Sequence, residues 1–391
     1  MPVKIAIVTS FFPSAPAPYT GAPLFAQIPW LKELAEIRVI CPRPAYPPVR
    51  FLQPRKYLYR HATGGYDLDG AEAEHIPFFT LPIISRAVNG YLVGRAVLGA
   101  VRRFAPDVIL AYTVYPDGYG ALRAGRRLGI PVILCGIGSD VRYIADSVQK
   151  RMAGSALRRA DYVLTVSDEL RERAIDLGAS PERSRAILNG CNTRIFQPMN
   201  RASMRQKLGV ATDAKEIVFV GRLLALKGLR ELLEAIAIVR REDRALELTC
   251  IGEGPLGEEL AARAVQEDLA GAVRFIPAAS PAQIAEWMAA ADITCLPSYT
   301  EGCPNAIVES LACGRAVVGT NVGGIPELVN ASNGILVRPH DPADLAQGIA
   351  AALARQWDEA AIAAASQRSW GEVARETVEV CAAVVESYRR S

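Results

Sequence analysis

Two glutamates in one short segment are the residues of this sequence best suited to chemistry. Glu301 and Glu309 are separated by seven residues, in a stretch that reads Thr-Glu-Gly-Cys-Pro-Asn-Ala-Ile-Val-Glu-Ser-Leu-Ala-Cys-Gly. Pro304 suits the first position of a helix and Gly314 suits its stop, so the pattern predicts a short helix whose free N–H groups form an anion site. Glu301 would lie before that helix and Glu309 inside it. The two acids then have different roles, unless they are only solvated surface groups.

Two cations are predicted at the end of an earlier strand. Arg222 follows the strand pattern 217–220 and Gly221, and Lys227 precedes the helical pattern 229–240. Fixed cations in a water-poor site stabilise a leaving group that gains negative charge as its bond breaks. The alternative is a strand-end arginine and a solvated lysine at the start of a helix.

A glycine-rich turn raises a rival interpretation. Residues 252–257 read Gly-Glu-Gly-Pro-Leu-Gly and fit the G-x-G-x-x-G pattern of dinucleotide-dependent oxidoreductases, with a strand before and a helix after. Such a site needs an acid at the end of the next strand to bind ribose, whereas residues 275–279 read Phe-Ile-Pro-Ala-Ala. Pro255 could also simply start the helix.

The elements that must hold these residues form an α/β pattern in two halves. With 391 residues the chain exceeds one ordinary core, so two domains are expected. Short Val- and Ile-rich runs alternate with longer helical patterns, which is typical of parallel sheets. The predicted strands are 3–9, 38–41, 108–111, 132–134, 162–166 and 185–188, then 217–220, 246–251, 273–276, 293–296, 316–319 and 335–337.

The domain boundary is expected near residue 199, where Gln197-Pro198 breaks the backbone after the turn-like run Asn189-Gly190-Cys191-Asn192. This gives an acceptor-side domain 1–199 and a donor-side domain 200–391, and the last helix, about 370–391, could pack back on the first domain. Two doubly wound, Rossmann-like halves facing each other would leave one cleft, with ligands beyond the carboxyl ends of the strands.

The Glu-Gly-Cys-Pro-Asn stretch with its two glutamates resembles the family 4 retaining glycosyltransferases, which have the GT-B fold. The resemblance implies that Glu301 touches the hydroxyls of the donor sugar and that Glu309 binds ribose. It implies that Arg222 and Lys227 clamp a diphosphate. The further donor-binding positions that it implies are Gly221, Gly252, Gly254, Gly302, Cys303, Pro304 and Asn305.

The first half matches this family more loosely. Gly21 ends a Pro-rich loop after the first strand and could let the backbone approach the sugar or acceptor, or it is a plain turn. The run Cys-Gly-Ile-Gly-Ser-Asp ends at Asp140, which could cap the next segment or reach the cleft. Ile137 stands where many family members have a histidine beside the sugar.

The charge is uneven along the chain. Residues 1–199 carry 25 Lys and Arg against 16 Asp and Glu, and residues 200–391 carry 19 against 25. The first half would be drawn to anionic surfaces. Four cations without an intervening acid, at Arg50, Arg55, Lys56 and Arg60, suit an anionic membrane, and nucleic acid is not expected as a partner.

Neither a metal nor a cofactor is expected. Asp67 and Asp69 imitate a metal-binding aspartate pair but follow two glycines in a polar stretch, and His61, His75 and His340 share no ligand spacing. The eight cysteines form no Cys-x-x-Cys pair, and the start of the chain reads as a strand without a secretory signal. A cytoplasmic location is expected, with possible docking on the inner face of the membrane.

The sequence therefore predicts retaining transfer of a sugar from a nucleoside diphosphate to a glycan or lipid-linked acceptor, in cell-surface polysaccharide biosynthesis. A catalytically silent sugar-nucleotide-binding protein remains an alternative because of Ile137. A dinucleotide-dependent oxidoreductase is a third hypothesis. The base, the sugar and the acceptor are left open.

Overall fold

The computed structural model describes residues 2–12, 21–46, 73–81, 87–142 and 147–390. Packing divides the chain into two units, which are Met1–Leu188 with Trp370–Ser391 and Asn189–Ser369. The division falls before residue 199, because the segment after Leu188 bonds to the second unit. The N–H of Cys191, for example, donates to the carbonyl of Arg368 at 2.9 Å.

The first unit contains one parallel sheet in the order β3-β2-β1-β4-β5-β6-β7. Its strands are β1 (Lys4–Val8), β2 (Glu36–Ala45), β3 (Ala73–Phe79), β4 (Val108–Tyr112), β5 (Val132–Gly136), β6 (Tyr162–Thr165) and β7 (Ser184–Ala186). Its helices are α1 (Ala22–Leu34), α2 (Asn89–Phe104), α3 (Tyr119–Leu128), α4 (Ser139–Arg142), α5 (Ser147–Arg159), α6 (Asp168–Asp176) and α15 (Trp370–Arg390).

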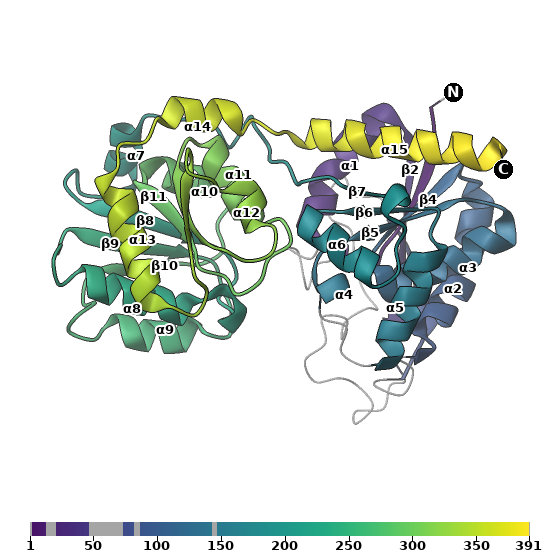
Figure 1. Ribbon diagram of the computed structural model, residues 1–391, viewed down its shortest axis with the longest axis horizontal. Helices are drawn as coiled ribbons and strands as arrows, with labels where there is room; N and C mark the ends of the chain where they lie inside the picture. The colour runs from purple at the N-terminus through teal and green to yellow at the C-terminus, as the bar shows by residue number, and fades with distance from the viewer. Residues whose placement is uncertain (1, 13–20, 47–72, 82–86, 143–146, 391) are drawn as a thin grey trace. The chain divides into compact units, whose positions relative to one another are not determined.

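Both faces of this sheet are buried under helices (Figure 1). Ile5 and Ile7 of β1 belong to the core under α1 and α15, whereas Ala6 and Val8 belong to the core under α2, α3 and α5. A strand buried on both sides must be apolar throughout, which explains the continuous apolar runs of the sequence. The last helix, α15, thus packs in the first unit although it ends the chain.

The second unit has a six-stranded parallel sheet in the order β10-β9-β8-β11-β12-β13. Its strands are β8 (Lys215–Val220), β9 (Leu246–Ile251), β10 (Val273–Ile276), β11 (Ile293–Leu296), β12 (Ala316–Thr320) and β13 (Gly334–Val337). Its helices are α7 (Arg201–Leu208), α8 (Leu229–Val239), α9 (Gly257–Ala264), α10 (Pro281–Ala290), α11 (Asn305–Ala312), α12 (Ile325–Leu328), α13 (Pro342–Ala354) and α14 (Glu359–Ala365).

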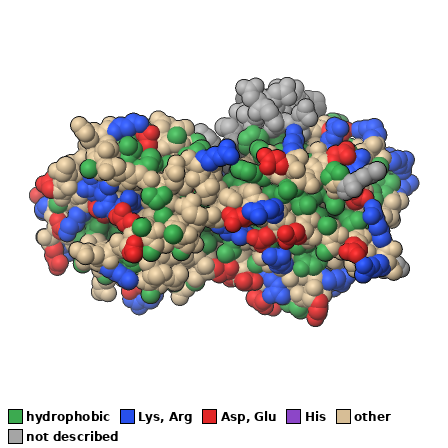
Figure 2. Space-filling model, turned by 90° about the horizontal axis from the view of Figure 1, so that it is seen from above, with side chains coloured by type: hydrophobic (Ala, Val, Ile, Leu, Met, Phe, Trp, Pro, Cys, Tyr) green, Lys and Arg blue, Asp and Glu red, His purple; other side chains and the backbone are tan. Residues whose placement is uncertain are grey.

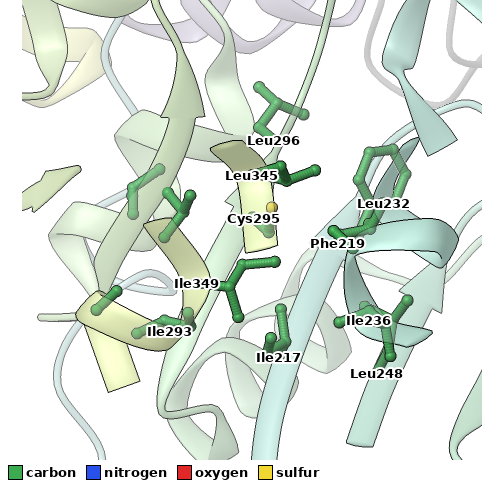
Figure 3. Packing of buried hydrophobic residues seen from close by; sticks show 14 of the residues in the cluster. Ile217, Phe219, Leu232, Ile236, Leu248, Ile293, Cys295, Leu296, Leu345 and Ile349 are labelled. Atoms are coloured by element: carbon green, nitrogen blue, oxygen red, sulfur yellow. The ribbon is translucent and has the colours of Figure 1, made fainter. Parts of the chain in front are cut away.

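Figure 3 shows the larger core of this unit, where Leu232 and Ile236 of α8 and Leu345 and Ile349 of α13 surround strand side chains such as Phe219. This core holds the ends of β8 and β11 in fixed positions, and both strands lead directly into the loops that carry the predicted site.

In each sheet the strand order reverses once, between β1 and β4 in the first unit and between β8 and β11 in the second. In doubly wound α/β domains, ligands bind beyond the carboxyl ends of the strands at this position. Both units therefore have a defined place for a ligand. Among the described helices, none is long and apolar enough to cross a membrane.

Candidate active site

The loops after β8 and β9 pack against each other through glycines. Gly252 has φ +139°, and a Cβ atom there would lie 2.1 Å from the carbonyl oxygen of Gly221. A Cβ atom on Gly254 would lie 2.4 Å from the carbonyl oxygen of Leu223. These glycines therefore allow the two loops to touch, which fixes the backbone on either side of Arg222.

Lys227 and Glu301 meet at the carboxyl edge of the second sheet. The Nζ atom of Lys227 lies 2.5 Å from Oε1 of Glu301, and the two side chains are only 23% and 12% exposed. The same oxygen accepts a hydrogen bond of 2.6 Å from the hydroxyl of Ser298, a fully buried residue after β11. The loops are also joined by the N–H of Tyr299, which donates to the carbonyl of Leu226 at 2.8 Å. Two of the predicted residues are thus brought into direct contact.

Arg222 occupies a different environment from Lys227. It is exposed and forms no ion pair with the residues that the structure describes. Its position at the end of β8, beside the direction change of the sheet, leaves the guanidinium available to an anion.

Helix α11 lies within one residue of the prediction, which had Pro304 at the first helical position. Pro304 caps it, the helix starts at Asn305, and Gly314 follows its end with φ +77°. The first N–H groups of any α-helix lack partners within the helix, so this end attracts anions. Because α11 follows β11, these N–H groups lie at the same edge of the sheet as Glu301.

Asn189 fastens the loop in front of α11. Its Nδ2 donates to the carbonyl oxygen of Cys303 at 3.0 Å and to Oδ1 of Asn305 at 2.8 Å, and its backbone N–H donates to Sγ of Cys303 at 3.3 Å. The side chain is buried. The segment predicted as a turn therefore also positions the stretch assigned to donor binding.

Glu309 lies in the second turn of α11 and is partly buried. Burial raises the pKa of this carboxyl to about 7, because no charged partner offsets the loss of solvation. A carboxyl group that changes its charge near neutral pH is a frequent feature of functional sites.

In the first unit, Gly21 and Asp140 both have clear structural roles. Gly21 precedes α1 with φ +71°, and a Cβ atom there would lie 2.3 Å from the carbonyl oxygen of Phe11. Asp140 accepts backbone N–H groups from Val114 at 2.9 Å and from Ile137 and Gly138 at 3.0 Å each. Asp140 thus holds two loops together, which is neither of the two roles considered for it from the sequence.

Asp117 is a residue that the sequence analysis missed. It is fully buried where the chain leaves β4, and its Oδ2 accepts both the N–H of Ser10 at 2.5 Å and the hydroxyl of Ser10 at 2.7 Å. Burial raises the pKa of Asp117 to about 6. Its Oδ1 has no hydrogen-bond partner in the described part of the chain. A polar residue in the run Tyr-Pro-Asp-Gly directly after a buried strand was the available signal.

The two described histidines each contact another side chain. His75 accepts a hydrogen bond from Nε of Arg43 at 3.4 Å, and the ring of His340 stacks on Tyr299 with 3.6 Å between centroids. The described residues contain no group of three or more metal-ligating side chains. The positions that lie outside the described residues are Arg50, Arg55, Lys56, Arg60, His61, Asp67 and Asp69.

The two doubly wound α/β units agree with the GT-B fold, and comparisons with known proteins identify the class as glycosyltransferases. Residues 214–355 match the family described as glycosyl transferases group 1, and residues 26–190 match the glycosyl transferase 4-like domain. The chain is 31% identical over 368 residues to a Bacillus subtilis protein named as the teichuronic acid biosynthesis glycosyltransferase TuaC, covering 89% of this chain and 88% of that protein. The chain therefore belongs to the family 4 glycosyltransferases.

Other relatives match only part of their length. A D-inositol 3-phosphate glycosyltransferase of Streptosporangium roseum is 33% identical over 240 residues, which are 57% of this chain and 55% of that protein. Among solved structures, HepE of Anabaena in complex with UDP has a TM-score of 0.75 at 22% identity, covering 97% of this chain and 100% of that one. Sucrose-phosphate synthase of Thermosynechococcus elongatus has a TM-score of 0.70 at 20% identity, covering 99% and 98%. These structures support the fold.

Proposed function

We propose that this glycosyltransferase moves a sugar from a nucleoside diphosphate to a glycan or lipid-linked acceptor with retention of anomeric configuration. The observation that carries the proposal is the meeting of Lys227 and Glu301 at the edge of the sheet where α11 begins. A diphosphate would bind the cation and the N–H groups, and the sugar would bind the carboxylate. The UDP bound to HepE and the name of the TuaC relative support a nucleotide-sugar donor and a role in cell-surface polysaccharide biosynthesis.

The proposed chemistry is a displacement at the anomeric carbon. The bond from that carbon to the phosphate oxygen breaks while the acceptor hydroxyl forms a new bond from the same face. The proton of the hydroxyl passes to the departing phosphate oxygen. Because the acceptor attacks from the face that the diphosphate leaves, this step needs no nucleophile of the enzyme, and Arg222 and Lys227 stabilise the charge that develops on the diphosphate.

Fixed cations can also replace the metal that other transferases use, and we propose that turnover needs neither metal nor cofactor. The reaction is expected to continue in EDTA. If chelation stops it and Mn²⁺ or Mg²⁺ restores it, the cation clamp is wrong and Asp67 and Asp69 become candidates.

The decisive experiment has two steps. First, UDP, GDP and ADP sugars are screened for thermal stabilisation, since a ligand at 100 times its Kd adds about 2.7 kcal/mol to the free energy of unfolding. Second, the stabilising donor is incubated with glycan and lipid-linked acceptors, and free nucleoside diphosphate and the anomer of the product are measured. An inverted product contradicts retention. Binding without turnover favours a silent sugar-nucleotide-binding protein.

We further propose that Gly21 and the loop held by Asp140 serve the acceptor, and that Arg50, Arg55, Lys56 and Arg60 dock the enzyme on an anionic membrane. Each cation held near such a surface contributes about 1 kcal/mol, so four give weak, salt-sensitive docking. Co-sedimentation with anionic vesicles at low salt, and its loss when all four are changed to Gln, tests this. Equal sedimentation of both proteins, or of neither, contradicts the docking role.

A further inference from the structure

A hollow of about 330 Å³ lies between α3 and α5 in the first unit, and none of the residues that line it was assigned above. Four arginines from the two helices line it, together with a serine, a tyrosine and two apolar residues. The lining residues are Tyr119, Leu122, Arg123, Arg126, Arg127, Ser155, Ala156 and Arg159.

The charge around this hollow is of one sign. Helix α3 carries three arginines and α5 carries Lys150, Arg151, Arg158 and Arg159, and neither helix contains an Asp or Glu. The four arginines that line the hollow form no ion pair with a described residue. On the face of the molecule in Figure 2, by contrast, blue and red side chains are interspersed.

Helix ends explain only part of this arrangement. Arg126, Arg127, Arg158 and Arg159 lie in the last turns of α3 and α5, where cations favour the helix dipole. That effect does not require the side chains to converge on one hollow. Arg123 lies nearer the start of α3, and its guanidinium stacks 4.3 Å from the ring centroid of Tyr91.

Aromatic contacts fix the side of the hollow where Arg123 lies. The rings of Tyr91 and Tyr119 are 5.3 Å apart between centroids, and Tyr119 also packs edge-on against Tyr115 at 6.1 Å. Stacking of a guanidinium on a ring fixes the plane of its N–H groups without neutralising its charge. The hollow is therefore a concave site lined by four arginines, with which no acid of the described residues forms an ion pair.

We propose that this hollow binds the phosphate group of a phosphate ester. Guanidinium forks match phosphate oxygens two at a time, and the hydroxyls of Ser155 and Tyr119 can supply neutral donors. The volume is at the lower end for small-molecule sites and is large enough for a phosphate or pyrophosphate group. The ester could belong to a phospholipid or to a soluble ligand, and both sources present the same chemistry.

The hollow is separate from the loops assigned to the acceptor. Helix α3 begins after β4 and ends before β5, and α5 ends before β6. In a parallel sheet, such helices return from the carboxyl edge to the opposite edge, so the arginines of their last turns lie away from Ser10 and Asp117. The phosphate site thus adds a second anion site to the chain, independent of the donor site.

Calorimetric titration of the full-length protein with inorganic pyrophosphate tests the proposal. All proteins carry Arg222→Gln and Lys227→Gln, so that pyrophosphate cannot report on the proposed donor site. The test variant changes Arg126, Arg127 and Arg159 to Gln, and the control changes Arg95, Arg102 and Arg183, which are exposed in the same unit. We expect at least a tenfold loss of affinity in the test variant and less than a twofold loss in the control.

Equal losses in the two variants, or no binding to the parent protein, overturn the proposal. The single variant Arg126→Glu, at an exposed position, serves in case the triple variant misfolds. It is expected to weaken pyrophosphate binding at least fivefold. Unchanged affinity in this variant contradicts the site. Vesicles of phosphatidylglycerol then separate the two sources, with Arg50, Arg55, Lys56 and Arg60 changed to Gln in every protein so that the proposed docking segment does not contribute. Sedimentation of the control but not of the test variant identifies a phospholipid, and pyrophosphate binding without sedimentation of either identifies a soluble phosphate ester.

Discussion

Lys227 and Glu301, which come from loops after different strands, form an ion pair of 2.5 Å at the edge of the second sheet. Each is a proposed ligand of a different part of the donor, the diphosphate for Lys227 and the sugar for Glu301. In a partly buried pair, removal of one partner leaves the other charge without compensation. The effects of removing the two side chains on turnover should therefore be coupled, and a double-mutant cycle can measure this.

Glu301→Ala is expected to lower kcat by about 100-fold or more, in the range found when one transition-state contact is removed. Nucleoside diphosphate affinity should change little, because the proposed contact is to the sugar. Glu267→Ala, an exposed carboxylate away from the site, serves as the control in the same assay. In a double-mutant cycle with Lys227→Ala, we expect the two losses not to add. Normal turnover in Glu301→Ala, or strict additivity, contradicts the arrangement.

The raised pKa of Glu309 predicts a pH dependence of donor binding. In the role expected from the family resemblance, the ionised carboxylate would accept hydrogen bonds from ribose hydroxyls, and with a pKa of about 7 it becomes protonated as the pH falls below neutrality. The donor KM should therefore rise below about pH 7, measured as initial rates at saturating acceptor. Glu309→Gln should have a high donor KM that no longer changes through this range. A variant that retains the pH dependence of the parent shows that another group is responsible.

The same shift has an opposite consequence for stability. The folded-state pKa of Glu309 lies above its ordinary value of 4.5, so the folded protein binds an extra proton between about pH 4.5 and 7. The contribution of this group to the free energy of unfolding is therefore largest at low pH and decreases as the pH rises through that window. Chemical denaturation of parent and Glu309→Gln at pH 5 and pH 8 should show a smaller difference between the two pH values in the variant.

Asn189 gives a prediction about positioning. Asn189→Ala removes two side-chain hydrogen bonds. It leaves the backbone carbonyl oxygen of Cys303 and the side-chain oxygen Oδ1 of Asn305 without this donor. The expected cost is about 1–3 kcal/mol in the free energy of unfolding, together with a raised donor KM. Asn192→Ala, a change on the exposed part of the same segment, is the control for denaturation and kinetics. If Asn189→Ala has the stability and the donor KM of the parent, the tie to α11 is unimportant.

The sequence predicted the second unit better than the first for a physical reason. Every strand of the second sheet contains at least three apolar residues, and residues 246–251, 273–276 and 293–296 were predicted with their observed bounds. In the first sheet β3 was missed, because it is an edge strand that tolerates Glu74, His75 and Pro77. An edge strand is hydrogen-bonded to a neighbour on one side only. It therefore needs no continuous apolar run, and it can accommodate a proline, which lacks the N–H group.

The contacts within the candidate site could also be predicted only in part from the sequence. The residues that contact each other through short loops, such as Glu301 with Ser298, follow from a local pattern that sequence can reveal. The contacts of Asn189 with Cys303 and of Asp117 with Ser10 join positions more than a hundred residues apart. Nothing in the periodicity of a chain reports such a pair, because it depends on which strand ends the topology brings together.

Asp117 leads to the last prediction, which concerns the acceptor. Its carboxylate holds both the N–H and the hydroxyl of Ser10, at the start of the loop that we assign to the acceptor, and burial raises its pKa to about 6. The other groups that act on it are Thr113, through a hydroxyl at 3.4 Å, and Arg43, whose charge opposes the effect of burial. Protonation below pH 6 removes the charge that accepts these hydrogen bonds, so the hold on Ser10 should weaken.

The acceptor KM is therefore expected to rise as the pH falls through about 6, at saturating donor, whereas the donor KM changes nearer pH 7. Asp117→Asn keeps the size of the side chain but cannot ionise, so its acceptor KM should be raised by about tenfold and should not vary between pH 5 and 7. Asp176→Asn, an exposed carboxylate in the same unit, is the control. An acceptor KM in Asp117→Asn that follows the same pH profile as the parent would show that the buried carboxyl does not position the loop.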